Sequence, residues 1–562
     1  MAGDALAAHV ASSESATPSW MEIISASALG ISVVIRLLVT WRRPLGHDDF
    51  FWAYTSWLRS GDGIPNVDYY LPNFTPLEIA APLFRAFPES LVPIHMARGI
   101  FFVVGVGLVL ACYYLARTLG ASVGWALAAA NVFSWHHYIV QHLADIRADQ
   151  LMSICFIMTL TIILSGRRAG AAGFAFGAAI ALSYKIGVAG PWLLVAVVAM
   201  AKRNWLSVTI RFVAASTILP TLYFGTRIFL DGWPTFLAVW RDIFGAMGTG
   251  TSPRFAVFAN SFWAGGLSWL FIFMGAIGLA RPVAGDPQLT RRRHLFILLV
   301  LAFTATYVSL NPFIFPYNFV ILMPLYAVSV VGVPQALRTT DRLSRLARPL
   351  IVIVPLTAAL SGTPATLLSI RTTNEVQESV LQWLWHATEK QDAVFDWQGI
   401  HVGRPGVFHW WHYSGLQPKY LGGWYSVEKE IRQSQVKTVL VNYRLAWLSP
   451  ADRKFIQTSF VAIDTCMLAP GWVLNGEDIR RGTVIEAFLN DATYRVQGGD
   501  DSGILINGRP IGQLERLRAG RHFITAVPGA AIPSRITIYY TTPKRERTTP
   551  PCLGGALIAS NL

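Results

Sequence analysis

Long apolar segments separated by short polar breaks fill the chain up to about residue 370. A helix that crosses a bilayer needs about 20 consecutive apolar residues. The pattern therefore predicts about eleven membrane-spanning helices and an α-helical polytopic membrane protein. Between residues 171 and 201 it leaves two alternatives open, namely one kinked helix or two short helices that meet near Gly187 and Gly190. The predicted spans are residues 21–41, 95–117, 122–139, 150–165, 171–185, 186–201, 207–230, 263–280, 294–310, 315–334 and 349–370.

The remaining residues, 371–562, have the composition of a soluble protein. Helix-like and strand-like segments alternate in residues 371–470, which predicts an α/β fold. From 471 to 562, apolar and polar residues alternate between glycine-rich turn signals, which predicts a small antiparallel β module. We therefore expect a transmembrane domain over residues 1–370, followed by two small soluble modules.

The chain carries 46 Lys and Arg residues against 32 Asp and Glu, a formal net charge of +14. Much of the basic charge lies in short loops between apolar segments, on alternate sides of the predicted membrane. The positive-inside rule assigns such loops to the cytoplasm, so nucleic-acid binding is not needed to explain the charge. This orientation predicts a cytoplasmic N-terminus and a soluble tail in the periplasm or outside the cell, on the side where acidic residues gather.

Two adjacent carboxylates, Asp48 and Asp49, follow the first apolar segment directly. Their position alone leaves two interpretations open. A carboxylate at a helix N-terminus is favoured by the helix dipole, by about 0.3–1 kcal/mol. Alternatively, one carboxylate of the pair is a general base that accepts a proton from a substrate hydroxyl.

The residues around this pair resemble the first loop of the GT-C superfamily of glycosyltransferases, and most closely its branch of bacterial protein O-mannosyltransferases and aminoarabinose transferases. The resemblance rests on GHDDFFWAY at 46–54, GDGIPNVDYY at 61–70, and Pro76-Leu77. It implies a GT-C-like fold and a first-loop catalytic base, which falls on Asp48 or Asp49. It also implies substrate contacts from the same loop, at Asp68 and Tyr69.

Lys185 lies inside an apolar stretch, where an unpaired Lys costs about 2.5–3.5 kcal/mol even on mild scales. It either snorkels to the interface or has a functional partner. Its segment is similar to a Leu-Thr-Lys-Gly patch of the same family, which implies that Lys185 neutralises the donor phosphate beside a substrate-binding Tyr184. Arg241 and Arg254, in a later outer loop, are further candidates for phosphate binding. Tyr317 is a candidate substrate contact because its segment is similar to the family's Pro-Arg-Tyr stretch.

Asp145 and Asp149 flank Arg147 in the second outer loop. Because they are four residues apart, a helix would place both on one face. The pattern leaves open a divalent-cation site for Mg²⁺ or Mn²⁺ and a self-neutralising Asp–Arg–Asp cap. In the tail, Cys466 and Cys552 are the two cysteines that an outside location would allow to form a disulfide.

Taken with the resemblance, the sequence predicts a multi-pass glycosyltransferase of the bacterial inner membrane. It would transfer a hexosyl or pentosyl group, with inversion, from a polyprenyl-phosphate-linked donor to a hydroxyl acceptor on the periplasmic side. The expected partners are this donor, membrane lipids, and a glycan, lipid or protein acceptor of the cell envelope. The alternative is a transporter or flippase of lipid-linked sugars without chemistry, although such proteins usually contain two related halves and no internal repeat is visible.

Overall fold

A computed structural model describes residues 19–61, 75–143, 145–166, 168–201, 204–234, 236–237, 240–241, 254–311, 314–338, 341–407, 420–498 and 503–548. The chain divides into two compact units. The first comprises Met1–Arg42, Arg98–Phe229 and Thr251–Thr372, and the second comprises Arg43–Ala97, Leu230–Gly250 and Thr373–Leu562. The first loop, with Asp48 and Asp49, therefore belongs to the same unit as the tail.

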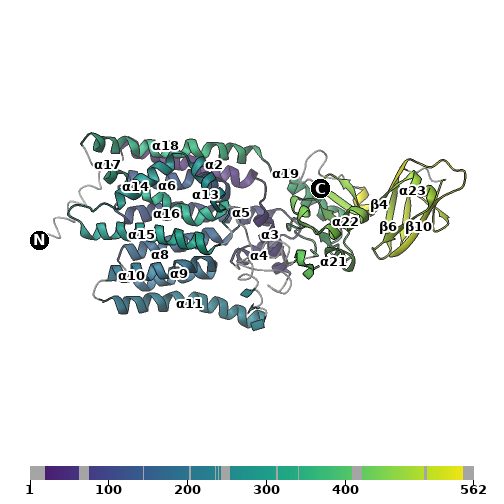
Figure 1. Cartoon of the computed structure of the whole chain (residues 1–562), viewed down its shortest axis with the longest axis horizontal. Coiled ribbons are helices and arrows are strands. Elements are labelled where there is room, and N and C mark those ends of the chain that lie inside the picture. Colours follow the sequence, from purple (N-terminus) through teal and green to yellow (C-terminus); the bar gives the residue numbers. More distant parts are fainter. Residues whose placement is uncertain are drawn as a thin grey trace. The chain divides into compact units, whose positions relative to one another are not determined.

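The first unit is built from helices, labelled in Figure 1. Among the described residues, seven helices are long and apolar enough to cross a membrane, and the bent pair of α13 and α14 would make eight. Each of the eleven predicted spans coincides with a helix or a helix pair, while the number that crosses the membrane stays a prediction. The helices are α2 (Trp20–Arg42), α5 (Val92–Thr118), α6 (Val123–Trp135), α7 (His137–His142), α8 (Ala148–Leu164), α9 (Ala169–Leu182), α10 (Gly190–Ala201), α11 (Trp205–Asp231), α13 (Arg254–Gly265), α14 (Leu267–Leu279), α15 (Pro287–Leu310), α16 (Phe319–Ser329), α17 (Val333–Leu337) and α18 (Asp341–Arg371).

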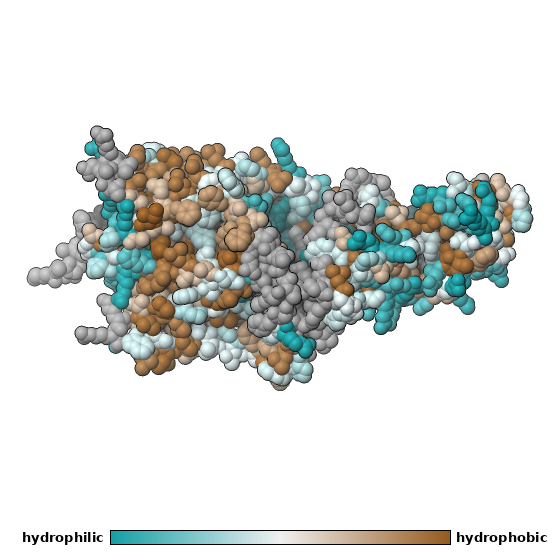
Figure 2. Space-filling model, in the orientation of Figure 1, coloured by the Kyte–Doolittle hydropathy of each residue, from teal (hydrophilic) through white to brown (hydrophobic). Residues whose placement is uncertain are grey.

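Large apolar side chains cover the outside of these helices, which Figure 2 shows as brown surface. Leu222 on α11 and Leu360 on α18 are 62% and 72% exposed. Soluble monomers rarely expose apolar patches larger than a few hundred Å². The apolar exterior and the length of the helices identify a multi-pass membrane protein.

The segment from 171 to 201 contains two helices rather than one kinked helix. Helix α9 ends at Leu182, Ser183 is extended (φ −159°, ψ 116°), and a 3₁₀ turn, η1 (Tyr184–Ala189), leads into α10 at Gly190. The break places Lys185 on the 3₁₀ turn. Its side chain is therefore carried by irregular backbone and not by the middle of a continuous helix.

The glycines of α9 allow a close helix contact within the first unit. A Cβ atom added at Gly173 would lie 2.1 Å from the carbonyl oxygen of Phe212 on α11, and one at Gly177 would lie 2.6 Å from that of Ser216. Small residues spaced four apart let two membrane helices approach until their backbones touch. This contact packs α11 against α9. Helix α9 is the helix that ends at the break at Ser183.

Two sheets and several helices form the second unit. The larger sheet has seven strands in the order β1-β2-β4-β11-β6-β9, with β3 also paired to β4, and the smaller has the order β5-β10-β7-β8. The strands are β1 (Val394–Phe395), β2 (Thr438–Leu440), β3 (Phe460–Asp464), β4 (Met467–Asn475), β5 (Thr483–Ala487), β6 (Ala492–Gln497), β7 (Ile504–Ile506), β8 (Arg509–Pro510), β9 (Leu514–Leu517), β10 (Gly520–Ala526) and β11 (Arg535–Tyr540). The helices are α3 (His47–Ser60), α4 (Thr75–Ala86), α19 (Glu375–Ala387), α21 (Val427–Gln433), α22 (Pro450–Ser459), α23 (Gly476–Arg481) and α24 (Pro543–Glu546).

The boundary predicted between residues 470 and 471 falls inside β4. This strand pairs with β2 and β3, which precede it in the chain, and with β11, which follows it. One sheet therefore draws strands from both predicted soluble modules, and the division of the tail into two domains stays a prediction. Cys466, just before β4, takes part in a disulfide, and Cys552 lies outside the described residues.

Hydrogen bonds attach the first loop to the tail within the second unit. The main chain of Leu45 is hydrogen-bonded to the side chain of Gln377 on α19. The guanidinium of Arg404, which is 1% exposed, donates a hydrogen bond to the carboxylate of Glu89. The same guanidinium also donates to the hydroxyl of Thr388 at 2.7 Å. The tail thus holds the loop that carries the two adjacent carboxylates.

Candidate active site

Asp48 and Asp49 occupy the first turn of α3, but their environments differ. Asp49 is 1% exposed, and its Oδ2 atom accepts a hydrogen bond from the N–H of Gly46 at 3.0 Å. The guanidinium of Arg43 lies 3.9 Å from the same oxygen. Asp49 is therefore the helix-capping carboxylate. Asp48 is only half-buried, which leaves it the more accessible acid of the pair.

An aromatic run holds α3 in place behind these acids. The residues from Phe50 to Tyr54 are buried. The hydroxyl of Tyr54 accepts a hydrogen bond from the N–H of Gly406 at 2.7 Å, and its ring lies 4.3 Å from that of His401. Burial, aided by the charge of Asp396, raises the pKa of Tyr54, so its hydroxyl stays neutral. The start of α3 is therefore anchored by packing and by a neutral hydrogen bond.

A second group of candidate residues lies in the first unit, where two cations share one carboxylate. The guanidinium of Arg147 donates to Oδ2 of Asp149, with Nε at 3.1 Å and Nη2 at 3.0 Å. The Nζ atom of Lys185 lies 3.9 Å from Oδ1 of Asp149. Asp149 is 3% exposed, and its Oδ1 accepts no hydrogen bond from a described residue. Arg147, Asp149 and Lys185 together carry one net positive charge.

Tyr317, on the 3₁₀ turn η3 (Pro316–Asn318), lies against both cations. The guanidinium carbon of Arg147 is 3.3 Å from the centre of its ring, and Nζ of Lys185 is 6.0 Å from that centre. Stacking on an aromatic ring stabilises a cation and leaves its donor atoms to one side. Asn318 fixes the turn because it donates to the hydroxyl of Tyr307 at 2.9 Å and accepts from the N–H of Phe315 at 2.7 Å.

The prediction that Asp145 and Asp149 share one helix face is wrong. Asp145 lies in the bend between α7 and α8, and Arg147 is extended (φ −145°, ψ 145°) just before α8 begins. The side chain of Gln150 holds this bend through hydrogen bonds to the carbonyl oxygens of His142 and Asp145. The carboxylate of Asp145 instead contacts Nδ1 of His142 at 2.8 Å.

No metal ligand set is present among the residues that the structure describes, since none of their His, Cys, Asp and Glu side chains form a group of three or more. The sequence leaves open a divalent-cation site and a self-neutralising cap. Asp149 neutralises a cation, because it pairs with Arg147. Asp145 contacts Nδ1 of His142, and the Asp–Arg–Asp cap stays a prediction.

The other candidate residues lie in several places. Tyr184 is half-buried at the start of η1, next to Lys185, and Arg241 is exposed. Arg254 begins α13, and its side chain lies outside the described part of the structure, as do Asp68 and Tyr69. Sequence reasoning missed the contact of Arg147 with Tyr317, because the two residues are far apart in the chain and no local pattern links them.

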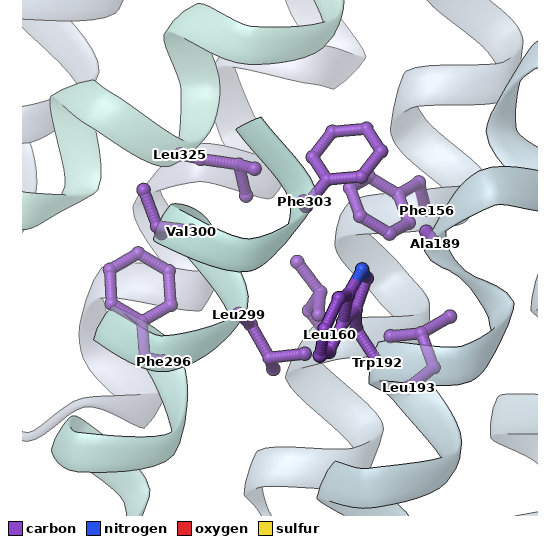
Figure 3. Close-up of a pocket in the computed structure, with 10 residues that line it drawn as sticks. All are labelled: Phe156, Leu160, Ala189, Trp192, Leu193, Phe296, Leu299, Val300, Phe303 and Leu325. Atoms are coloured by element: carbon purple, nitrogen blue, oxygen red, sulfur yellow. The ribbon is translucent and has the colours of Figure 1, made fainter. Parts of the chain in front are cut away.

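A small cavity lies between α8, α10, α15 and α16, and Figure 3 shows the apolar side chains that line it. Its volume is about 10 Å³. This is the lower limit for holding one water molecule, and apolar cavities of this kind stay dry. The cavity is a packing gap between helices and does not belong to the candidate site.

The chain combines a helical unit with apolar spans, a first loop that carries two acids, and a tail that contains two sheets. The structure is similar to that of ArnT from Cupriavidus metallidurans bound to undecaprenyl phosphate, with a TM-score of 0.56 and 13% sequence identity over 81% of this chain and 98% of that one. ArnT from the same organism in the apo state gives a TM-score of 0.53 and 13% identity over 79% and 97%. No protein-family model and no curated protein matches the sequence. The GT-C-like fold predicted from the first loop is confirmed.

Proposed function

We propose that this protein is a membrane glycosyltransferase that uses a polyprenyl-phosphate-linked sugar as donor. The observation that carries the proposal is the sharing of Asp149 by Arg147 and Lys185 beside Tyr317, in a chain with the ArnT fold. The ArnT of that comparison was solved with undecaprenyl phosphate, which has the chemistry of the lipid-phosphate part of the proposed donor. Cations in a membrane unit are costly unless anions pair with them, and a lipid phosphate is an anion that belongs in that environment.

In the proposed reaction, Lys185 and Arg147 bind the phosphate of the donor. The acceptor oxygen attacks the anomeric carbon of the sugar from the side opposite the phosphate. The bond from that carbon to the phosphate oxygen breaks, and its electron pair stays on the phosphate. The two cations stabilise the charge that develops there, and the anomeric configuration inverts.

Asp48 takes the proton of the acceptor hydroxyl in this proposal. Its partial exposure supports this assignment, whereas the carboxylate of Asp49 is occupied by Gly46 and lies near Arg43. Asp49 acts by holding the first turn of α3 in place. Arg241 and Arg254 remain candidates for further contacts with the donor phosphate, and Tyr184 and Tyr317 for contacts with the substrate.

The reaction takes place on the periplasmic side of the bacterial inner membrane. The distribution of basic residues among the loops supports this placement, because it assigns the first outer loop and the tail to that side. The acceptor is then a hydroxyl of a cell-envelope glycan, lipid or protein. The alternative, a transporter of lipid-linked sugars, would leave the sugar–phosphate bond intact.

A transfer assay with purified protein in lipid nanodiscs tests the proposal. Radiolabelled polyprenyl-phosphate sugars are incubated with cell-envelope acceptors and wild-type protein, Asp48→Asn, Lys185→Met or the control Lys454→Met. We expect wild-type transfer, a fall of at least about 100-fold for Asp48→Asn, as for loss of a general base, and a comparable fall for Lys185→Met. Absence of transfer from every donor in wild type, with labelled lipid crossing the bilayer intact, would support the transporter instead.

The exposed Lys454 on α22 provides the matched control for Lys185, because both substitutions replace one lysine by methionine and remove one positive charge. Equal activity of Lys185→Met and wild type contradicts the phosphate-binding role of Lys185. Equal activity of Asp48→Asn and wild type contradicts its role as base while leaving the transferase assignment intact.

A further inference from the structure

A groove with a volume of about 360 Å³ opens on one face of the larger sheet in the second unit. Its floor is formed by two neighbouring strands, where Thr537 and Tyr539 of β11 pair with Gln497 and Arg495 of β6. Residues opposite each other in register point to the same side of a sheet. The floor is therefore a flat surface of one hydroxyl, one amide, one phenol and one guanidinium group.

The walls of this groove add aromatic and charged side chains. Trp383 of α19 lies on one side, and Arg545 and Glu546 of α24 on another. Trp383 is 4% exposed, and its indole N–H has no hydrogen-bond partner among the described residues.

The groove contains one positive charge that is not balanced locally. Arg495 and Glu546 form an ion pair, with Nη2 2.8 Å from Oε1, and so neutralise each other. Arg545 is 8% exposed, and it forms no ion pair with any residue of the described chain. Its Nη2 atom donates to the carbonyl oxygen of Lys437 at 2.9 Å and to the hydroxyl of Thr438, whereas its Nε and Nη1 atoms have no partner there.

Aromatic rings hold this guanidinium in place. Its central carbon lies 4.9 Å from the ring centre of Tyr540 and 5.5 Å from that of Trp383. Burial lowers the pKa of Arg545 to about 10, so the group remains charged at neutral pH. The carboxylate of Asp392 attracts this guanidinium but is also paired with Lys437 at 2.6 Å, so the three groups carry one net positive charge. An anionic ligand in the groove would balance that charge.

We infer that this groove binds an acidic saccharide, with its carboxylate toward Arg545 and its sugar rings against Trp383 and Tyr539. Both floor strands are paired on both sides, β11 with β4 and β6, and β6 with β11 and β9. A peptide therefore cannot bind here as an added strand, which is the common way that sheets bind peptides. The choice of a saccharide also rests on the proposed function, in which a hydroxyl-bearing acceptor must be held.

Isothermal titration calorimetry on the full-length protein in nanodiscs tests the inference. The probes are trigalacturonic acid, the neutral trisaccharide galactotriose, and the acidic peptide triglutamate. We expect trigalacturonic acid to bind at least tenfold more tightly than either of the others. Equal binding of the acidic and neutral saccharides, no binding of either, or tighter binding of triglutamate overturns the inference.

Two variants and two matched controls locate the binding. Arg545→Gln removes the unbalanced charge, and Thr537→Trp fills the floor of the groove. Arg516→Gln removes an exposed cation from β9 of the same sheet, and Thr525→Trp places the same large side chain on β10 of the other sheet. We expect binding of trigalacturonic acid to fall at least tenfold for the first two variants and to change less than twofold for the controls.

If Arg545→Gln does not fold, as judged by its thermal unfolding, Thr537→Trp decides the outcome. Wild-type affinity in Thr537→Trp contradicts the location of the site. The transfer assay separates this inference from the proposed function. Sugar transfer without saccharide binding overturns the groove alone, and saccharide binding without transfer by wild type overturns the proposed function alone.

Discussion

Gln377 and Leu45 form two reciprocal hydrogen bonds across 332 positions of the chain. The N–H of Leu45 donates to Oε1 of Gln377 at 2.7 Å, and Nε2 of Gln377 donates to the carbonyl oxygen of Leu45 at 3.1 Å. Both residues are buried, so water does not replace either bond. The amide side chain on α19 therefore fixes the main chain just before α3 and its carboxylates.

Replacing Gln377 by Ala should destabilise the second unit and loosen its first loop. The change removes both bonds and leaves buried main-chain groups unsatisfied, at a cost of about 2–3 kcal/mol. We expect a lower midpoint of thermal unfolding and faster proteolysis within residues 43–97. Gln382→Ala, on the exposed side of the same helix, is the control and should behave like wild type. Unchanged proteolysis of Gln377→Ala would show that the loop is held by other contacts.

Asp48 and Asp49 should respond differently to the same conservative change. Asp49→Asn weakens the cap of α3 and its attraction to Arg43, so we expect a loss of about 1 kcal/mol in stability. Asp48→Asn should leave the unfolding midpoint within one degree or so of wild type, while abolishing transfer. Thermal unfolding and the transfer assay, run on the same preparations, check both. The assignment of roles is reversed if Asp49→Asn keeps its stability and loses activity.

Gly173 and Gly170 lie on the same helix and should differ in their tolerance of a methyl group. A Cβ at Gly173 would lie 2.1 Å from a carbonyl oxygen of α11, whereas nothing lies within 4 Å of one at Gly170. Gly173→Ala must separate α9 from α11, and we expect a loss of about 1–3 kcal/mol, typical of overpacking. Gly170→Ala should be neutral or stabilising by up to about 1 kcal/mol, since Ala favours the helix. Thermal unfolding in detergent compares the two, and equal midpoints would rule out this helix contact.

Tyr54 should make the second unit sensitive to alkaline pH. Its pKa is raised by burial above the ordinary value of 10.0, so the folded state retains the phenol proton where the unfolded state loses it. This contribution to stability is complete below pH 10 and is lost as the pH rises toward the folded-state pKa. We expect the unfolding midpoint of wild type to fall more steeply above pH 10 than that of Tyr54→Phe. Parallel curves for the two proteins would contradict the buried, neutral phenol.

The helices of the first unit could be predicted because a bilayer imposes length and apolarity on each segment separately. The first-loop motif then gave the fold, since it combines the acid pair, the aromatic run and the Pro-Leu that lies in α4. The break at Ser183 was one of two predicted alternatives. In each case the information lies within one short stretch of sequence.

Contacts between distant residues could not be predicted in the same way. The grouping of residues 43–97 with the tail depends on pairs such as Leu45 and Gln377, which no local pattern links. The helical spacing of Asp145 and Asp149 was misleading because the chain bends before α8, where Gln150 binds main-chain carbonyls. Arg147 contacts Asp149 and also Tyr317, a residue far from it in the chain.

The single carboxylate between Arg147 and Lys185 also bears on the end of the proposed reaction. A sugar linked through a phosphodiester carries one negative charge, whereas the phosphate monoester that remains after transfer carries nearly two at neutral pH, as phosphorylated side chains do. In the proposed reaction, a site with two cations is expected to hold the spent lipid more tightly than the fresh donor. We therefore expect the spent lipid to inhibit transfer by competing with the donor.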